Sequence, residues 1–275
     1  MGTRRCLQVI MVILGICQIG SLEAGGVIAR QQWQDYGWPL ADTPGAQPVS
    51  RSMTAVDWVA SELPGQPALH YDYQPLRIRS GDPAHNGHLH RLSVGVDGSL
   101  RQWRLKARLG LHGTSNIFKY QEPHRDAVVG KVVLWRELED APLEAIGLGG
   151  DHRFGHFQWL PRLRWEQSIG GHRLRLDLPL GCYWVGPRQR WRFRAERLGD
   201  KWGALNAGRD FRSAIYLEEW QLVASRRFRL LRSGWFLELG LGMSLDTRVR
   251  YRETDRREVR RDFGNSAFGL VQLRW

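Results

Sequence analysis

Residues 103–112, with the sequence WRLKARLGLH, alternate between apolar and polar side chains, Gly110 apart. The apolar side chains take the odd positions from Trp103 to Leu111, and the basic ones take the even positions from Arg104 to Arg108. Successive side chains of a β-strand point to opposite faces, so this pattern predicts a strand with one apolar and one basic face.

The same alternation returns in residues 157–165, 172–184, 190–196, 235–252 and 267–275. Runs of about 9 to 18 residues exceed the strands of about six residues common in soluble proteins, and they suit tilted strands that cross a bilayer. Arginines crowd the polar faces, which suits a wet lumen, and Trp and Tyr lie near strand ends, where an interfacial belt would be. We therefore predict an all-β fold, a transmembrane antiparallel up-and-down β-barrel, although a soluble β-sandwich would share the alternation.

Three turns support the strand registers. The apolar positions switch between even and odd across Asp97-Gly98, across Gly170-Gly171 and across Gly186-Pro187. Paired residues that flank a two-residue turn share a face, so a hairpin requires this switch.

The final segment places Ala267, Gly269, Val271, Leu273 and Trp275 on one face and ends on the aromatic residue. This ending resembles the C-terminal signature of Gram-negative outer-membrane β-barrels, and the region from about residue 67 onward is similar to uncharacterised families of that class. The resemblance implies a location in the cell outer membrane and recognition of Val271, Leu273 and Trp275 by the barrel-assembly machinery. It implies nothing about a substrate.

The chain divides into three expected parts. Residues 1–24 have the layout of a signal peptide, because Arg4 and Arg5 precede an apolar stretch that is too short to span a membrane as a helix. Residues 25–66 are expected to form a periplasmic extension or a segment that plugs the lumen, and residues 67–275 the barrel. The ten expected strands lie near 68–79, 88–96, 100–112, 127–138, 154–166, 172–185, 188–198, 212–230, 235–252 and 267–275. Twelve strands are the alternative, with one added near residues 143–150 and another in the N-terminal region.

Strand direction follows from the terminal residue, which should lie at the periplasm. Loops 253–265, 199–210, 117–126 and 81–87, with the Gly170-Gly171 turn, are then expected outside, and residues 139–153 are expected at the periplasmic end.

The composition fits a folded, exported protein. Apolar residues make up 42% of the 275 residues, which is too many for a disordered chain. The 40 basic residues exceed the 28 acidic ones and give a net charge of +12. Cys182 alone remains after the signal peptide, so no internal disulfide is expected. Nucleic acid is not an expected partner in this compartment, and the chain is expected to be a monomer.

One basic set is expected to face the lumen: Arg104, Lys106, Arg108, Arg162, Arg164, Arg173, Arg175, Arg190, Arg192, Arg194, Arg248, Arg250 and Arg252. Such a lining would concentrate small anions and form a conduit for them. The same arginines could instead fill a narrow lumen by pairing with acidic residues on neighbouring strands.

A second basic set, Arg256, Arg257, Arg260 and Arg261, lies in the loop before the last strand. These side chains could bind phosphates of lipopolysaccharide, or they could belong to an ordinary solvated loop. Lipid and lipopolysaccharide of the outer membrane are the expected partners. The alternative to a conduit is thus a closed barrel with a structural or lipopolysaccharide-binding role in the envelope.

No cofactor, metal or enzyme activity is expected. His85, His88 and His90 lie close in sequence, but a bare histidine cluster is weak evidence for a metal site. A lipid hydrolase would need a serine beside a histidine near the outer leaflet, and the strand pattern offers His90 and His172 no serine on the same face.

Overall fold

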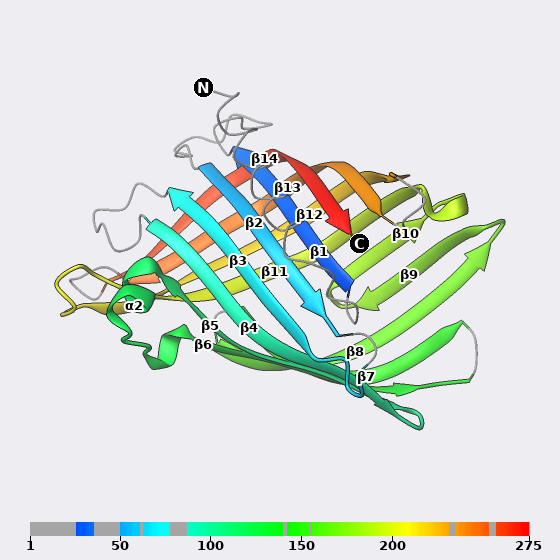
Figure 1. The fold of residues 1–275 in the computed structure, drawn as a ribbon, viewed down its shortest axis with the longest axis horizontal. Helices are drawn as coiled ribbons and strands as arrows, with labels where there is room; N and C mark the ends of the chain where they lie inside the picture. Colours follow the sequence, from blue (N-terminus) through cyan, green and yellow to red (C-terminus); the bar gives the residue numbers. More distant parts are fainter. Residues whose placement is uncertain are drawn as a thin grey trace.

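The computed structural model describes residues 26–35, 50–60, 63–77, 87–139, 142–154, 156–230, 235–252 and 257–274. These residues form a closed barrel in which each strand pairs with the next and β1 pairs with β14 (Figure 1). The strands are β1 Gly26–Asp35, β2 Ser50–Val59, β3 Ala68–Arg77, β4 Gly87–Leu100, β5 Trp103–Thr114, β6 Val128–Glu137, β7 Leu143–Phe154, β8 His156–Ile169, β9 His172–Leu178, β10 Gly181–Val185, β11 Trp191–Leu205, β12 Arg212–Arg229, β13 Phe236–Arg252 and β14 Glu258–Arg274. Between β5 and β6 lie the short helix α2, Ser115–Tyr120, and the 3₁₀ turn η2, Arg125–Ala127.

The strand number is a correction to the ten expected, because the described residues form β1 to β14. Residues 25–66 contribute β1 and β2 to the wall, so these two strands are neither an extension nor a plug. The expected strand 172–185 is a hairpin of β9 and β10, because the chain turns at Pro179 and Leu180 donates its backbone N–H to Asp177. The alternative strand near 143–150 exists as β7. The proposed signal peptide, 1–24, lies outside the described residues.

The first described strand begins, and the last one ends, at the same rim of the barrel, because Ile28 of β1 pairs with Arg274 of β14. We call this end the terminal rim and the opposite end, which carries α2, the loop rim. The added strands β1 and β2 do not change the directions expected for the strands that follow them. The extra strand β7, and the division of residues 172–185 into β9 and β10, move some of the turns between β6 and β11 to the other rim. Gly170-Gly171 consequently lies at the terminal rim rather than outside, and residues 143–153, expected at a periplasmic loop, are part of a wall strand.

Two of the predicted hairpins have their turn where the sequence placed it. Gly170 and Gly171 both have positive φ and join the paired residues Ile169 and His172, as a two-residue hairpin turn requires. Gly186 and Pro187 open the β10–β11 turn. The third turn is displaced, because Asp97-Gly98 lies inside β4 and the chain reverses at residues 101–102.

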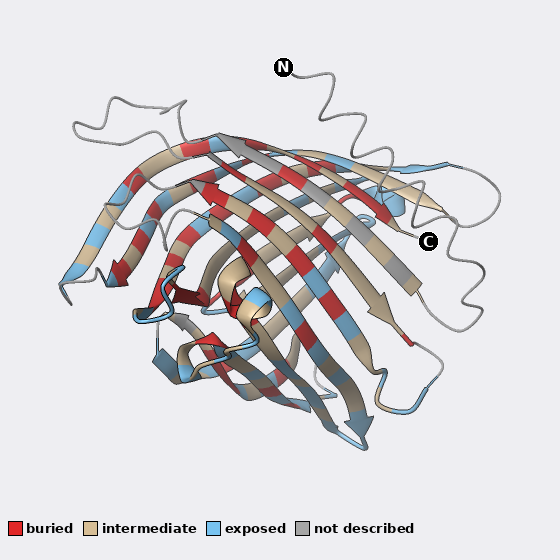
Figure 2. Cartoon of the chain, turned by 60° about the vertical axis from the view of Figure 1, so that its left-hand side comes forward, coloured by how far each residue is buried: buried red, intermediate tan, exposed pale blue. Residues whose placement is uncertain are grey.

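The outer face of the wall is apolar, as the sequence predicts. Exposed apolar side chains occur on β3 to β9 and on β11 to β13, and they include Leu92, Val94, Leu105, Leu109, Leu148, Trp159, Phe193, Leu222 and Leu241. Buried and exposed residues alternate along the neighbouring strands (Figure 2).

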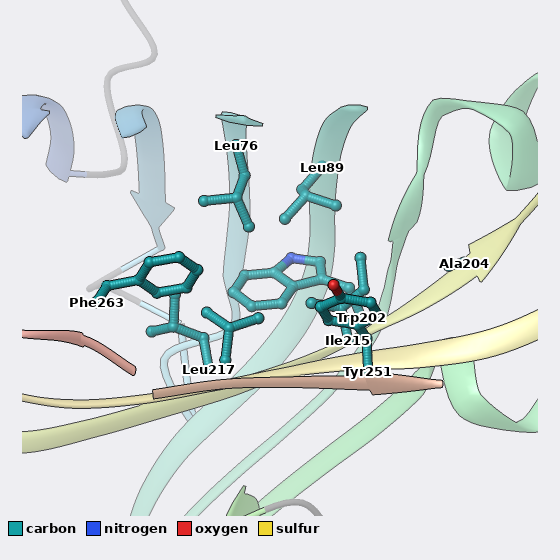
Figure 3. Close-up of a cluster of buried hydrophobic side chains, with 9 residues drawn as sticks. Leu76, Leu89, Trp202, Ala204, Ile215, Leu217, Tyr251 and Phe263 are labelled. Carbon is teal, nitrogen blue, oxygen red and sulfur yellow. The ribbon is translucent and has the colours of Figure 1, made fainter. Parts of the chain in front are cut away.

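The inner face in the half toward the loop rim is filled by apolar side chains (Figure 3). This luminal core consists of Leu76, Leu89, Trp202, Ala204, Ile215, Leu217, Val249, Tyr251 and Phe263, each at most 3% exposed. It draws on β3, β4 and β11 to β14, so it crosses from one side of the barrel to the other.

The luminal core is enclosed by a local narrowing of the barrel. Residues 181–185 of β10 pair with only the first part of β11, and further along Gly203 of β11 pairs instead with Gly113 of β5. Ile117 and Ala127 pack against Leu205 outside this junction. In the half toward the loop rim, β1–β5 and β11–β14 therefore come together around the core without β6–β10.

Candidate functional site

Most of the expected basic set lies on the inner face. On β11, Arg192 and Arg194 share the parity of Trp202, which belongs to the luminal core. Cross-strand registers place the following side chains on the same inner face: Arg104, Lys106, Arg108, Arg162, Arg164, Arg173 and Arg175. Arg190 lies in the turn before β11, at the terminal rim.

The last three members of that set are a correction. The β13–β14 register shifts between Ser244 and Arg248, and Asp246 has a positive φ. A bulge of this kind adds a residue to one strand and so exchanges the faces that follow. Val249 and Tyr251 consequently enter the luminal core, and the alternate residues Arg248, Arg250 and Arg252 lie on the outer face near the loop rim.

A buried polar network lies on the inner face beside the luminal core. Glu219 has a fully buried side chain, and the guanidinium of Arg51 donates to it at 2.8 Å. Gln221 and Thr247 also donate to Glu219, at 2.6 and 3.3 Å, and Arg51 donates further to Gln74 at 2.9 Å. These contacts satisfy a charge that could not be buried alone.

A second network joins β3, β4, β5 and β11 across the lumen. Arg91 lies 2.7 Å from Asp72 and also pairs with Asp200. His112 lies 3.1 Å from the same carboxylate of Asp200. Together with the luminal core, the two networks obstruct the middle of the barrel and its half toward the loop rim.

The half toward the terminal rim is more accessible and more basic. The side chains of Arg173 and Lys106 are 51% and 45% exposed there, in contrast to the luminal core. Many of the arginines have acidic partners, as the filled-lumen alternative expects: Arg104 lies 2.8 Å from Asp97, and Arg164 lies 2.8 Å from Asp177. For Arg108 no ion pair occurs among the described residues.

Five arginines gather on the inner face of β1, β11, β12 and β14 in this half: Arg30, Arg192, Arg194, Arg227 and Arg274. We call them the basic cluster. Arg30 is close enough to Arg194, and Arg192 to Arg227 and Arg274, for their charges to repel.

Two carboxylates accompany the basic cluster. Glu238 lies 3.4 Å from Arg192 and 3.8 Å from Arg227, and Glu196 lies 2.9 Å from Arg194. Among the described residues, the buried Nε atoms of Arg192 and Arg274 have no hydrogen-bond partner. Excess positive charge and unused donors are the features that a bound anion would satisfy.

Arg30, Arg227 and Arg274 were not predicted from the sequence to face the lumen, for different reasons. Arg30 lies in β1, which the sequence did not identify as a strand. Arg227 lies in an expected strand, on the parity opposite to the exposed Leu222 and Phe228, so the alternation could have identified it. The inner position of Arg274, opposite to Leu273 on the last strand, could have been found in the same way.

The expected surface set is only partly described. Arg256 lies outside the described residues. Arg257 and Arg260 are exposed, and Arg260 lies 3.3 Å from Glu258, whereas Arg261 is half-buried. Val271 and Leu273 lie on the outer face of β14, and Trp275 lies outside the described residues.

No family model and no curated protein matches the sequence. The fold is similar to a bacterial polysaccharide outer membrane secretin, at 10% identity and a TM-score of 0.43, with 93% of this chain and 99% of that one covered. It is also similar to OccK2 (OpdF) of Pseudomonas aeruginosa, solved with glucuronate, at 8% identity and a TM-score of 0.33, with 92% and 97% covered. OmpT of Vibrio cholerae, an outer membrane protein, matches at 11% identity and a TM-score of 0.30, with 91% and 98% covered. Similarity at this level assigns neither a family nor a substrate to this chain.

Proposed function

We propose that this chain is an outer-membrane β-barrel, closed in its half toward the loop rim, whose basic cluster binds small anions that enter from the terminal rim. The apolar outer face supports the membrane location, because a closed barrel leaves no unpaired strand edge in lipid and needs apolar side chains around it. The terminal rim would face the periplasm, because the last strand of outer-membrane barrels ends at the periplasmic side.

The observation that carries the proposal is the luminal core. A wet pore needs a continuous polar path, but here nine apolar side chains at most 3% exposed occupy the interior between opposite walls. The polar and accessible part of the lumen therefore opens toward the terminal rim only.

The preferred ligand is a compact anion with phosphate or carboxylate groups. Guanidinium groups bind such groups through paired N–H donors, and the crowding of five arginines around two carboxylates leaves positive charge to be neutralised.

The second candidate is a gated conduit for anions, which the inner-facing arginines of β5, β8, β9 and β11 favour. It requires the luminal core to move, whereas simple binding does not.

Calorimetry of the refolded mature protein with inorganic phosphate tests anion binding. Arg192→Gln should weaken binding by at least about tenfold, since a charge-assisted hydrogen bond contributes about 1.5–3 kcal/mol. Arg250→Gln is the matched control, because this arginine lies on the outer face and should leave the affinity unchanged. Equal affinity for all three proteins would contradict a site at the basic cluster.

Current through a planar bilayer tests closure. The wild-type barrel should show no steady conductance, and Trp202→Ala, which removes the largest side chain of the luminal core, should produce measurable current. Discrete anion-selective steps from the wild type would support the conduit and overturn the closed state.

A further inference from the structure

The outer face near the loop rim carries a polar group that neither the luminal core nor the basic cluster uses. Tyr71 of β3 and His90 of β4 lie on the face opposite to the inner Asp72 and Arg91. Ser115, the first residue of α2, directly follows the end of β5 and reaches the same place.

Hydrogen bonds connect these three side chains in a row. The Oγ of Ser115 lies 2.8 Å from Nε2 of His90, and the hydroxyl of Tyr71 lies 2.9 Å from Nδ1 of the same ring. The Ser115 hydroxyl is also 3.4 Å from the carbonyl oxygen of His88. Both ring nitrogens of His90 therefore have a partner.

Aromatic neighbours hold the imidazole in this position. The ring of Tyr73 lies 5.2 Å from that of His90, and Phe118 of α2 meets it edge-on at 5.4 Å. Phe118 comes from the same helix as Ser115, so the contact that orients the ring also fixes the helix that supplies the hydroxyl.

We propose that Ser115 and His90 form the nucleophile and general base of a site that hydrolyses acyl esters of outer-leaflet lipids, with Tyr71 as a positioning residue. A serine hydroxyl hydrogen-bonded to an imidazole, whose other nitrogen is held by a third group, is the arrangement that activates a weak nucleophile. This proposal differs from the sequence-based expectation of no enzyme activity. That expectation considered only serines on the strand faces, and Ser115 lies beyond the end of β5.

The position on the barrel selects the substrate. The outward side chains next along β4 are Leu92 and Val94, both exposed. Two residues of strand span about 7 Å, so His90 lies at the border of the apolar band that faces the loop rim. Acyl ester groups of lipids lie at that border, between the hydrocarbon core and the polar headgroups.

Each step conserves protons and electrons. The Oγ of Ser115 attacks the ester carbonyl carbon while its proton passes to Nε2 of His90, and Nδ1–H of His90 donates to the Tyr71 oxygen. The carbon–oxygen bond to the lipid alcohol breaks, and that alkoxide takes the proton from Nε2. Water then passes a proton to the same nitrogen and attacks the acyl-serine. The bond between the acyl carbon and the Oγ of Ser115 breaks as Oγ takes that proton back from Nε2, which releases a fatty acid and restores Ser115.

The test uses the full mature chain refolded in detergent, with folding verified by a heat-shifted gel band. Mixed micelles of phosphatidylethanolamine and phosphatidylglycerol form one arm and purified lipopolysaccharide the other, and released fatty acids are measured by mass spectrometry. A fluorophosphonate probe reports the reactivity of Ser115 independently of the substrate.

Ser115→Ala and His90→Gln should each lower fatty-acid release at least about 100-fold, the usual contribution of such groups. Ser99→Ala, an inner-face serine of the same β4, is the matched control and should leave the rate unchanged. Tyr71→Phe should keep probe labelling of Ser115 but shift the pH–rate profile, which a purely structural role would not do. Release in one arm only would identify the lipid source.

Two results would overturn the proposal: folded wild-type protein that releases no fatty acid in either arm and leaves Ser115 unlabelled, or full activity in folded Ser115→Ala. Neither result bears on anion binding inside the barrel, because the two sites lie on opposite faces of the wall.

Discussion

Replacing Glu219 by alanine should cost about 3–5 kcal/mol of the free energy of unfolding, the usual loss when one partner of a buried ion pair is removed. The structure explains this size. The substitution leaves the guanidinium of Arg51, which is 9% exposed, without the carboxylate at 2.8 Å. It also removes the acceptor of the buried Gln221 and Thr247 side chains, and an unsatisfied buried donor costs about 1–3 kcal/mol.

Urea titration of the refolded barrel in phospholipid vesicles, followed by tryptophan fluorescence, measures this loss. Glu218→Ala is the matched control on the adjacent outer-face position. Glu218 lies 3.3 Å from Arg197, and both side chains are partly exposed, so its removal should cost below about 1 kcal/mol. The double substitution Arg51→Met with Glu219→Leu should recover the part of the loss that comes from the unpaired guanidinium, because it removes both charges and keeps the interior packed, whereas Gln221 and Thr247 still lack their acceptor. Equal costs for Glu219→Ala and Glu218→Ala would refute the assignment of Glu219 to a buried network.

Two further predictions concern the loop between β5 and β6. Burial lowers the pKa of His124, against the opposing effect of Asp126, so the folded loop prefers the neutral imidazole. The loop should therefore be fully stable above about pH 6.5, the unfolded value, and lose stability as the pH falls below it. The protection factors of residues 115–127 in hydrogen exchange, which correct for the intrinsic pH dependence of amide exchange, should be lower at pH 5 than at pH 7.5, and His124→Gln should abolish that difference. At the β5–β11 junction, an added Cβ on Gly203 would lie 2.9 Å from the backbone N of Ala127. Gly203→Ala should destabilise the barrel by about 1–3 kcal/mol in the same urea titration, whereas Gly269→Ala, with open space around it, should not.

The alternation was a sufficient guide wherever the inner face of a strand is charged and the outer face apolar. β5 and β11 are of this kind, and their arginines lie on the predicted face. β2 could not be recognised, because its inner face includes Met53 and Ala55 while its outer positions include Ser52 and Thr54. The contrast between the two faces is then lost, although the backbone pairing is complete.

Local backbone irregularity and long-range contacts limited the site prediction. A bulge near Asp246 moved Arg248, Arg250 and Arg252 from the inner face to the outer one, and alternation alone cannot locate a bulge. The luminal core was not predicted for a related reason. Around Ile215 and Leu217 apolar side chains occupy both faces, so the sequence does not show that one set fills the interior.

The two halves of the lumen therefore have different physical roles. Buried apolar side chains and paired charges occupy the inner face in the half toward the loop rim, where they stabilise the barrel. The basic cluster lies in the other half, where Arg192 and Arg194 are partly exposed and where the proposed anion would bind. In the proposed function the anion arrives through the terminal rim, whereas the lipid substrate of the second proposed site reaches the outer wall. Substitutions at Arg192 and at Ser115 should consequently act independently. A variant that carries both should lose as much anion affinity as the Arg192 variant and as much fatty-acid release as the Ser115 variant.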